Sequence, residues 1–137
     1  MPETDLVKKL KLKPGQRAGI LNAPGGYLKV LAPLPDDLEV LEELTGKFDW
    51  IQAFVRNKAE LDELLPNILS ALNPNSMLWL TFPKGTSKMQ TDLRRDKGWD
   101  SVQQADLKWI RLISIDEAWS AFALRPYKPG EARKSFC

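Results

Sequence analysis

Histidine is absent from this sequence of 137 residues, and cysteine occurs once, as Cys137. Without histidine the chain cannot build a Ser-His-Asp or Cys-His triad, the zinc helix of metalloproteases or a histidine general base. A single cysteine cannot form a disulfide within one chain and does not support a thiolate zinc site. The sequence therefore excludes histidine-based catalysis and predicts no metal site.

Long apolar runs are also missing. None approaches the roughly 20 residues needed to cross a bilayer, and the start, Met1–Pro2–Glu3, does not resemble a secretory signal. We therefore expect no membrane association and a cytoplasmic location. The net charge of +2 is too small to indicate nucleic-acid binding by itself, so nucleic acid is not expected as a partner. The basic residues nevertheless form two clusters: Lys8, Lys9, Lys11 and Lys13, and then Lys84, Lys88, Arg94, Arg95 and Lys97.

What is present fits one globular domain with a core. Apolar residues make up 43% of the chain and charged residues 28%, which are ordinary values for such a domain. No repeat or long linker divides the chain. We therefore predict a single α/β domain over residues 1–126 and a loosely ordered tail over residues 127–137.

The apolar pattern alternates between strands and helices. A capping-box spacing at Asn57 and Glu60 predicts the start of the clearest helix, and its apolar stripe continues across Pro66, which favours a kink over a break. The expected strands are 17–21, 48–55, 77–82, 109–115 and 118–124. Residues 38–41 form a weak candidate strand that could instead be helical. The other expected helices are 5–10, 27–31, 87–97 and 99–105. This order predicts a three-layer α/β/α Rossmann-like sheet of about five to six mostly parallel strands that ends in an antiparallel hairpin.

Two features carry a resemblance to class I S-adenosylmethionine-dependent methyltransferases. One is the turn Lys13–Pro14–Gly15–Gln16, which leads into a strand and then a glycine-containing loop. The other is Leu72–Asn73–Pro74–Asn75 before Leu78–Trp79–Leu80, with a terminal strand hairpin. The resemblance implies S-adenosylmethionine binding after the first strand, with ribose hydroxyls held by an acid after the second, here Glu42 or Glu43.

The loop after the first strand departs from that family. It reads Asn22–Ala23–Pro24–Gly25–Gly26, without the expected acid or the Gly-x-Gly-x-Gly spacing, and Pro24 removes a backbone donor. We therefore expect no cofactor, and specifically no micromolar binding of S-adenosylmethionine.

A closer resemblance is to a family of small uncharacterised bacterial proteins with no assigned activity. It extends from about Lys11 to Pro126, and it is carried by five segments: Phe82–Pro83–Lys84–Gly85–Thr86–Ser87, Thr91–Asp92–Leu93, Arg95–Asp96, Gly98–Trp99 and Ile115–Asp116–Glu117–Ala118–Trp119–Ser120–Ala121.

Ligands of open parallel sheets bind beyond the carboxyl ends of the strands. Here that edge is expected to collect residues 22–26, 56–57, 83–88 and 116–117. We predict an anion site where two lysines, two hydroxyls and the start of a helix coincide, built from Lys84, Gly85, Thr86, Ser87 and Lys88, with Asn22, Gly25 and Gly26 facing them. Accessory residues are Arg56, Asp92, Arg95, Asp116 and Glu117. The simplest alternative is an ordinary strand-to-helix turn that Ser87 caps.

Missing histidine, a missing cofactor loop and small size favour a non-catalytic or regulatory module over an enzyme. Its expected partner is a small anionic ligand or another protein. One alternative is a minimal methyltransferase or other group-transfer enzyme, with Lys84 and Asp116 in electrostatic roles. A second alternative is a structural subunit that forms homo-oligomers. No catalytic residue is identified from the sequence.

Overall fold

The computed structural model describes residues 5–27, 29, 37–84, 98–105, 107–116 and 118–127. These residues form a six-stranded mixed sheet in the order β2-β1-β3-β4-β6-β5. The strands are β1 (Arg17–Leu21), β2 (Glu39–Leu41), β3 (Phe48–Phe54), β4 (Leu72–Pro83), β5 (Leu107–Ser114) and β6 (Trp119–Pro126). The strands β2, β1, β3 and β4 pair in parallel, whereas β6 pairs antiparallel with both β4 and β5. The predicted Rossmann-like sheet with a terminal antiparallel hairpin is confirmed.

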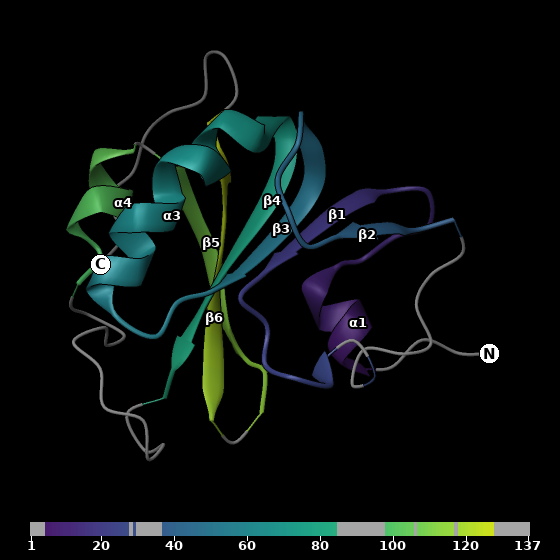
Figure 1. Cartoon of the computed structure of the whole chain (residues 1–137), viewed down its shortest axis with the longest axis horizontal. Coiled ribbons are helices and arrows are strands. Elements are labelled where there is room, and N and C mark those ends of the chain that lie inside the picture. Colours follow the sequence, from purple (N-terminus) through teal and green to yellow (C-terminus); the bar gives the residue numbers. More distant parts are fainter. Residues whose placement is uncertain are drawn as a thin grey trace.

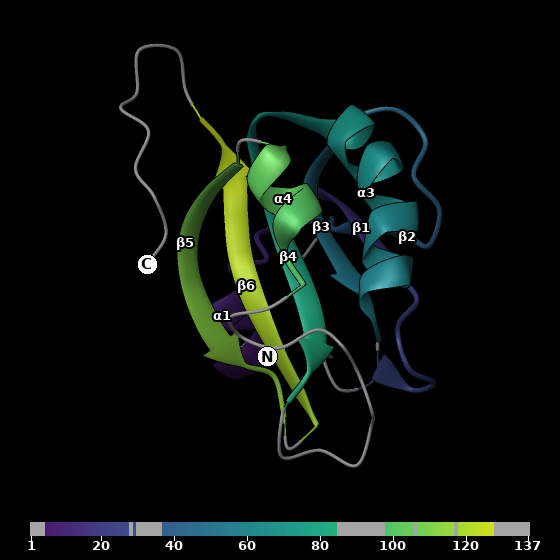
Figure 2. The same ribbon diagram turned by 90° about the vertical axis from the view of Figure 1, so that its left-hand side faces the viewer.

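Helices lie on both faces of the sheet. One face carries α3 (Lys58–Ala71) and α4 (Asp100–Gln104), and α1 (Asp5–Leu10) covers the other. Figure 2 shows α3 and α4 on one side and α1 partly hidden behind β5 and β6. Because strand side chains alternate between faces, β3 contributes to both cores: Ile51 packs under α3, and Trp50 packs under α1.

Helix α1 is held to the sheet by two tryptophans. The indole N–H groups of Trp50 and Trp79 both donate to the carbonyl oxygen of Leu10, at 2.7 and 3.0 Å. Both side chains are fully buried, so each donor must find a partner inside the protein. The carbonyl at the end of α1 satisfies both donors and positions the helix across the middle of the sheet.

The sequence predicted α3 well. Asn57 caps it by accepting a hydrogen bond from the Glu60 N–H at 2.8 Å, and Glu60 in turn accepts from the Arg56 N–H at 2.8 Å. The helix continues through Pro66, as its apolar stripe indicated. Residues 28, 30 and 31 of the helix predicted over 27–31 lie outside the described ranges. The whole helix predicted over 87–97 and residues 128–137 of the predicted tail lie outside them as well.

The connection from β2 to β3 is unusually short. Both strands are parallel to β1, so residues 42–47 alone must return the chain across the sheet, a task that normally takes a dozen or more residues and a helix. Gly19 on β1 makes this possible. A Cβ at Gly19 would lie 2.9 Å from Leu44 Cδ2 and 3.3 Å from the Phe48 ring, so a side chain here would force these neighbours to shift. Figure 1 shows this segment passing over β1 without a helix.

The parallel order brings the predicted edge together. The carboxyl ends of β1, β3, β4 and β5 share one edge, because β5 and β4 both run antiparallel to β6. Lys84 follows β4 and Asp116 follows β5, so both lie on the edge that also carries Asn22, as predicted. Among the described residues no helix is long and apolar enough to cross a membrane, and no group of three or more acidic, cysteine or histidine side chains is arranged to hold a metal.

Candidate functional site

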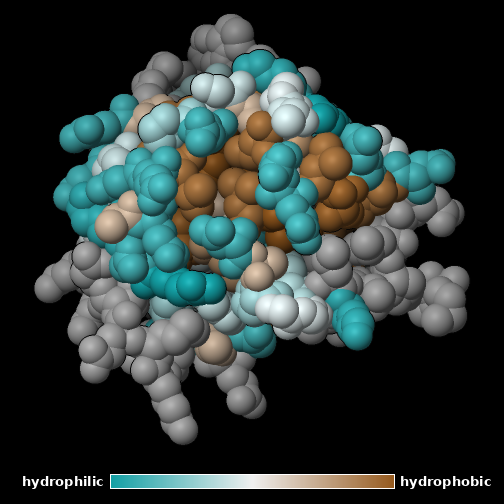
Figure 3. Space-filling model, viewed as in Figure 1, coloured by the Kyte–Doolittle hydropathy of each residue, from teal (hydrophilic) through white to brown (hydrophobic). Residues whose placement is uncertain are grey.

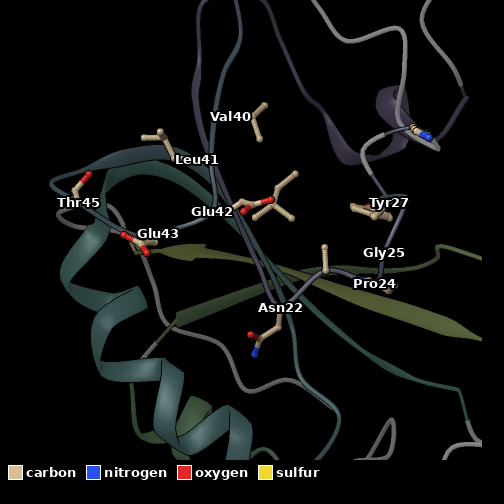
Figure 4. A pocket seen from close by; sticks show the side chains of 13 residues that line it. Asn22, Pro24, Gly25, Tyr27, Val40, Leu41, Glu42, Glu43 and Thr45 are labelled. Atoms are coloured by element: carbon tan, nitrogen blue, oxygen red, sulfur yellow. The ribbon is translucent and has the colours of Figure 1, made fainter.

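A pocket of about 900 Å³ opens at the carboxyl ends of β1 and β2. Its walls come from the loop after β1 and from β2 with the segment that follows it (Figure 4). Its size suits a nucleoside-sized ligand, since small-molecule sites usually measure roughly 300–1,000 Å³. The lining residues are Ile20, Asn22, Ala23, Pro24, Gly25, Gly26, Tyr27, Lys29, Val40, Leu41, Glu42, Glu43 and Thr45.

The loop after β1 turns sharply without the expected glycine spacing. Asn22 adopts a φ of 57° and Gly26 a φ of 82°, both in the left-handed region that glycine and asparagine tolerate best. A Cβ added to Gly25 or Gly26 would meet nothing within 4 Å. Gly25 and Gly26 both line the pocket and have open space beside their backbone, which a ligand can approach closely.

Tyr27 ties this loop to the sheet. Its hydroxyl donates to Gln52 Oε1 at 2.7 Å, and Gln52 Nε2 donates to Thr81 Oγ1 at 3.0 Å. All three side chains are buried, and the Tyr27 ring meets Phe54 edge-on at 4.7 Å. Burial raises the pKa of the Tyr27 phenol far above its ordinary value, and the Asp116 carboxylate raises this pKa further. Tyr27 is thus a neutral hydrogen-bond donor that fixes one wall of the pocket.

The opposite wall is acidic. Glu42 and Glu43 follow β2 directly, and both are exposed. Figure 4 shows the Glu42 side chain extending from the end of β2 into the space that Tyr27 faces from the other wall. Ile20, Val40 and Leu41 also line the pocket. The pocket thus combines apolar side chains, open backbone and two carboxylates.

A second pocket of about 500 Å³ lies on the α3 side of the same crossing segment. Leu44 and Leu64 line it, together with Asn22, Glu42 and Glu43, which also line the first pocket. Figure 3 shows apolar surface exposed over β1 and β2 on this face. Residues 42–44 therefore form a partition between two neighbouring hollows at the carboxyl edge.

The predicted anion-site residues are only partly brought together. Asn22, Gly25 and Gly26 line the first pocket, but Lys84 lines neither. Lys84 Nζ instead donates to Ser114 Oγ at 2.6 Å, which links the ends of β4 and β5. Arg56 is exposed after β3, and Asp116 accepts the Ala118 and Trp119 N–H groups at 2.8 and 2.9 Å. The remaining predicted residues lie outside the described ranges, so the anion site stays a prediction: Gly85, Thr86, Ser87, Lys88, Asp92, Arg95 and Glu117.

Several lining residues were missed from the sequence. Tyr27 and Thr45 were not considered, and Glu42 and Glu43 entered only through the resemblance to methyltransferases. The available signal was the order of elements, because an acid directly after a second strand and a glycine loop after the first must meet at one edge. The strand that precedes Glu42 was too weak in pattern to support that inference.

Comparison with solved structures identifies methyltransferase folds. The chain is similar to a SAM-dependent methyltransferase from Aquifex aeolicus, with a TM-score of 0.55, 17% identity and coverage of 88% of each chain. It is similar to magnesium protoporphyrin IX methyltransferase from Synechocystis PCC 6803, solved with SAH bound, with a TM-score of 0.57, 12% identity and coverage of 89% and 78%. A TehB-like SAM-dependent methyltransferase from Corynebacterium glutamicum gives a TM-score of 0.55, 11% identity and coverage of 89% and 85%. No protein-family model and no curated protein matches the sequence.

These similarities correct three predictions: the non-catalytic module, the tendency away from an enzyme, and the absence of a cofactor. The methyltransferase neighbours, one of them with SAH bound, favour the alternative of a minimal methyltransferase. The physical reason for the error is the weight given to glycine spacing. Asn22 makes the turn that a glycine was expected to make, and Gly25 and Gly26 still leave the backbone open.

Proposed function

We propose that this chain binds S-adenosylmethionine in the pocket at the ends of β1 and β2 and acts as a small methyltransferase. The observation that carries the proposal is the pairing of an open glycine loop after β1 with carboxylates after β2, across a pocket of about 900 Å³. The methyltransferase-like architecture supports this location, because ligands of such sheets bind beyond the carboxyl ends of the strands.

The residues present fit the cofactor chemically. Glu42, at the end of β2, would accept hydrogen bonds from the ribose hydroxyls, and a carboxylate makes such bonds strong. Gly25 and Gly26 would let the amino-acid end of the cofactor approach the backbone, and Ile20 and Val40 offer an apolar surface for the adenine. The cofactor carries positive charge at its sulfur and amino group and negative charge at its carboxylate, and the pocket lining holds Glu42 and Glu43 together with Lys29.

The absence of histidine does not argue against this activity. Bound S-adenosylmethionine supplies a methyl group already activated by its positive sulfur. The protein's main contribution to such a displacement is to hold the two reactants close and aligned, which can supply a large part of the rate acceleration. The lack of histidine excludes Ser-His-Asp and Cys-His triads. It does not exclude a methyl transfer in which the protein only positions the two reactants. No catalytic residue is assigned.

Four further predictions stay part of the proposal. The turn from Lys84 to Lys88 is proposed to bind an anionic group of the substrate at the same edge of the sheet. The chain is proposed to act in the cytoplasm, to fold as one domain over residues 1–126, and to share its architecture with the small bacterial family that it resembles in sequence.

Isothermal titration with S-adenosylhomocysteine, the demethylated product, tests the proposal. We expect micromolar affinity for the unchanged chain and affinity at least about tenfold weaker for Glu42→Gln, because a hydrogen bond to a charged group contributes about 1.5–3 kcal/mol. Glu63→Gln, an exposed change on α3, is the matched control and should bind like the unchanged chain. Absence of binding by the unchanged chain, or equal weakening in the control, would contradict the proposal.

A further inference from the structure

Among the described residues, basic side chains concentrate on the α1 side of the sheet, and most of those on α3 and α4 are acidic. On the α1 side, Val7 and Leu10 are fully buried, whereas Lys8, Lys9, Lys11 and Lys13 are all exposed. None of these four lysine side chains forms an ion pair with the described part of the chain. The helix thus packs its apolar side on the sheet and presents a row of lysines outward.

The terminal hairpin adds positive charge to the same face. Ala121 and Ala123 of β6 pack in the core that α1 covers, so Arg125, two residues further along the strand, lies on that face as well. Directly paired residues share a face. Lys108 pairs with Arg125, and Arg111 pairs with Ala123, which places both on the α1 side. The basic face is therefore defined by Lys8, Lys9, Lys11, Lys13, Lys108, Arg111 and Arg125.

Acidic residues concentrate on the opposite side. Helix α3 carries Glu60, Asp62 and Glu63, and α4 carries Asp100. At the amino edge, Glu39 is paired with the Arg17 guanidinium at 3.1 Å and Asp49 accepts the Arg17 N–H at 2.9 Å. Lys58 also lies on α3, so among the described residues the acidic excess on this side is smaller than the basic excess on the α1 side.

Lys11 is retained at a backbone position that suits glycine. It follows α1 with a φ of 60°. Its N–H donates to the Lys8 carbonyl at 3.2 Å, and the Leu12 N–H donates to the Val7 carbonyl at 3.3 Å. This is a Schellman motif, whose left-handed residue is usually glycine because a Cβ is strained there. A lysine here costs folding free energy and adds a charge to the basic face, which indicates a use for that charge.

We propose that the basic face binds the phosphate backbone of a nucleic acid. If the proposed function holds, nucleic acid is also the substrate class of the methyltransferase. The reason is that Ile20 and Tyr27, which line the cofactor pocket, lie on the same side of the sheet as α1. Spread lysines and arginines are the electrostatic footprint of backbone binding. A membrane partner is disfavoured, because membrane-surface binding also uses inserted apolar side chains. Leu112, the exposed large apolar residue of the described chain, pairs with Phe122 and so lies on the opposite face.

Fluorescence anisotropy with a short labelled single-stranded RNA, measured over a range of salt concentrations, tests the proposal. The patch variant combines Lys8→Gln, Lys9→Gln and Lys11→Gly, the last of which relieves strain while it removes charge. The matched control is Lys58→Gln on α3, which faces away from the basic face. We expect the patch variant to bind at least about tenfold more weakly, with the slope of log K against log salt reduced by about 0.7 for each lysine that contacts phosphate. The control should bind like the unchanged chain.

Each outcome decides the inference separately from the proposed function. The inference is overturned if RNA does not bind, if the patch variant binds as well as the unchanged chain, or if the control loses as much affinity. Tighter binding to phosphatidylserine vesicles than to RNA also overturns it, in favour of a membrane. RNA binding that depends on the lysines, without S-adenosylhomocysteine binding, would support the inference and contradict the proposed methyltransferase.

Discussion

Leu44 packs directly over Gly19 where the chain crosses from β2 to β3. A Cβ at residue 19 would lie 2.9 Å from Leu44 Cδ2, closer than carbon atoms pack. Leu44 belongs to the segment that crosses from β2 to β3, and the same segment begins with Glu42 and Glu43 at the pocket. The missing side chain at Gly19 therefore lets a short segment lie on the sheet and hold two carboxylates at its edge.

Gly19→Val should destabilise the fold by about 1–3 kcal/mol, since adding bulk to a packed core forces neighbours to shift. Leu44 could move, but the Phe48 ring at 3.3 Å is fully buried and lies under the Arg17 guanidinium. Urea unfolding measures the effect. Gly25→Ala is the control, because its Cβ would meet nothing, and it should stay within about 0.5 kcal/mol of the unchanged chain. Equal stability of Gly19→Val and Gly25→Ala would refute this account of the crossing.

Lys11→Gly should stabilise the protein by about 1 kcal/mol, because glycine adopts the left-handed conformation without the strain of a Cβ. Lys9→Gly, inside α1, provides the matched comparison and should destabilise by about 1 kcal/mol. Thermal unfolding of both variants checks the opposite signs. A loss of stability in Lys11→Gly would mean that the lysine side chain makes a stabilising contact that outweighs its strain.

Tyr27→Phe should loosen the loop that lines the pocket. The change leaves Gln52 Oε1 buried without its donor, which costs about 1–3 kcal/mol. Hydrogen exchange of the amides in residues 23–27 should accelerate with or without ligand, and the affinity for S-adenosylhomocysteine should fall. Unchanged exchange in this loop would show that packing of the Tyr27 ring against Phe54 alone holds the wall.

Ser101→Ala should raise the pKa of Asp62. The Ser101 hydroxyl donates to Asp62 Oδ1 at 2.6 Å, and this hydrogen bond, followed by that of Lys58, lowers the pKa of Asp62 below its ordinary value of 3.8. A carboxyl group whose pKa is lowered by folding stabilises the folded state at pH values above its ordinary pKa. That stability is lost as the pH falls through the lowered pKa. The stability difference between Ser101→Ala and the unchanged chain should therefore shrink under acid. Carboxyl NMR titration measures the pKa, and an unshifted Asp62 would contradict the assignment.

Strong local patterns explain why most of the fold could be predicted. Residues 48–55 are apolar on both faces, and the stripe through Leu61 and Ile68 has helical spacing across Pro66, so both elements formed close to their predicted bounds. The strand β2 was weak in the sequence because it has only three residues, Glu39–Leu41. It is held by pairing with Arg17–Gly19, a long-range interaction that leaves no periodic signal.

The site was harder to predict because distant segments build it. Asn22, Gly25 and Gly26 were correctly placed at the carboxyl edge, since edge position follows from strand order. The prediction that they bind no cofactor was wrong. It relied on a missing glycine motif, and the sequence does not show that Asn22 adopts the positive φ that a glycine was expected to adopt. The hydrogen bond from Tyr27 to Gln52 joins residues 25 positions apart, and no local sequence pattern predicts it.

Titration of ¹⁵N-labelled protein with S-adenosylmethionine, followed by amide NMR shifts, tests the central claim most directly, because it reports both binding and location. The account predicts saturable shifts at Gly25, Gly26 and Tyr27 on one wall and at Leu41 and Glu42 on the other, with amides of α4 unaffected. Shifts that map elsewhere, or no shifts at saturating ligand, would contradict a cofactor site at the ends of β1 and β2.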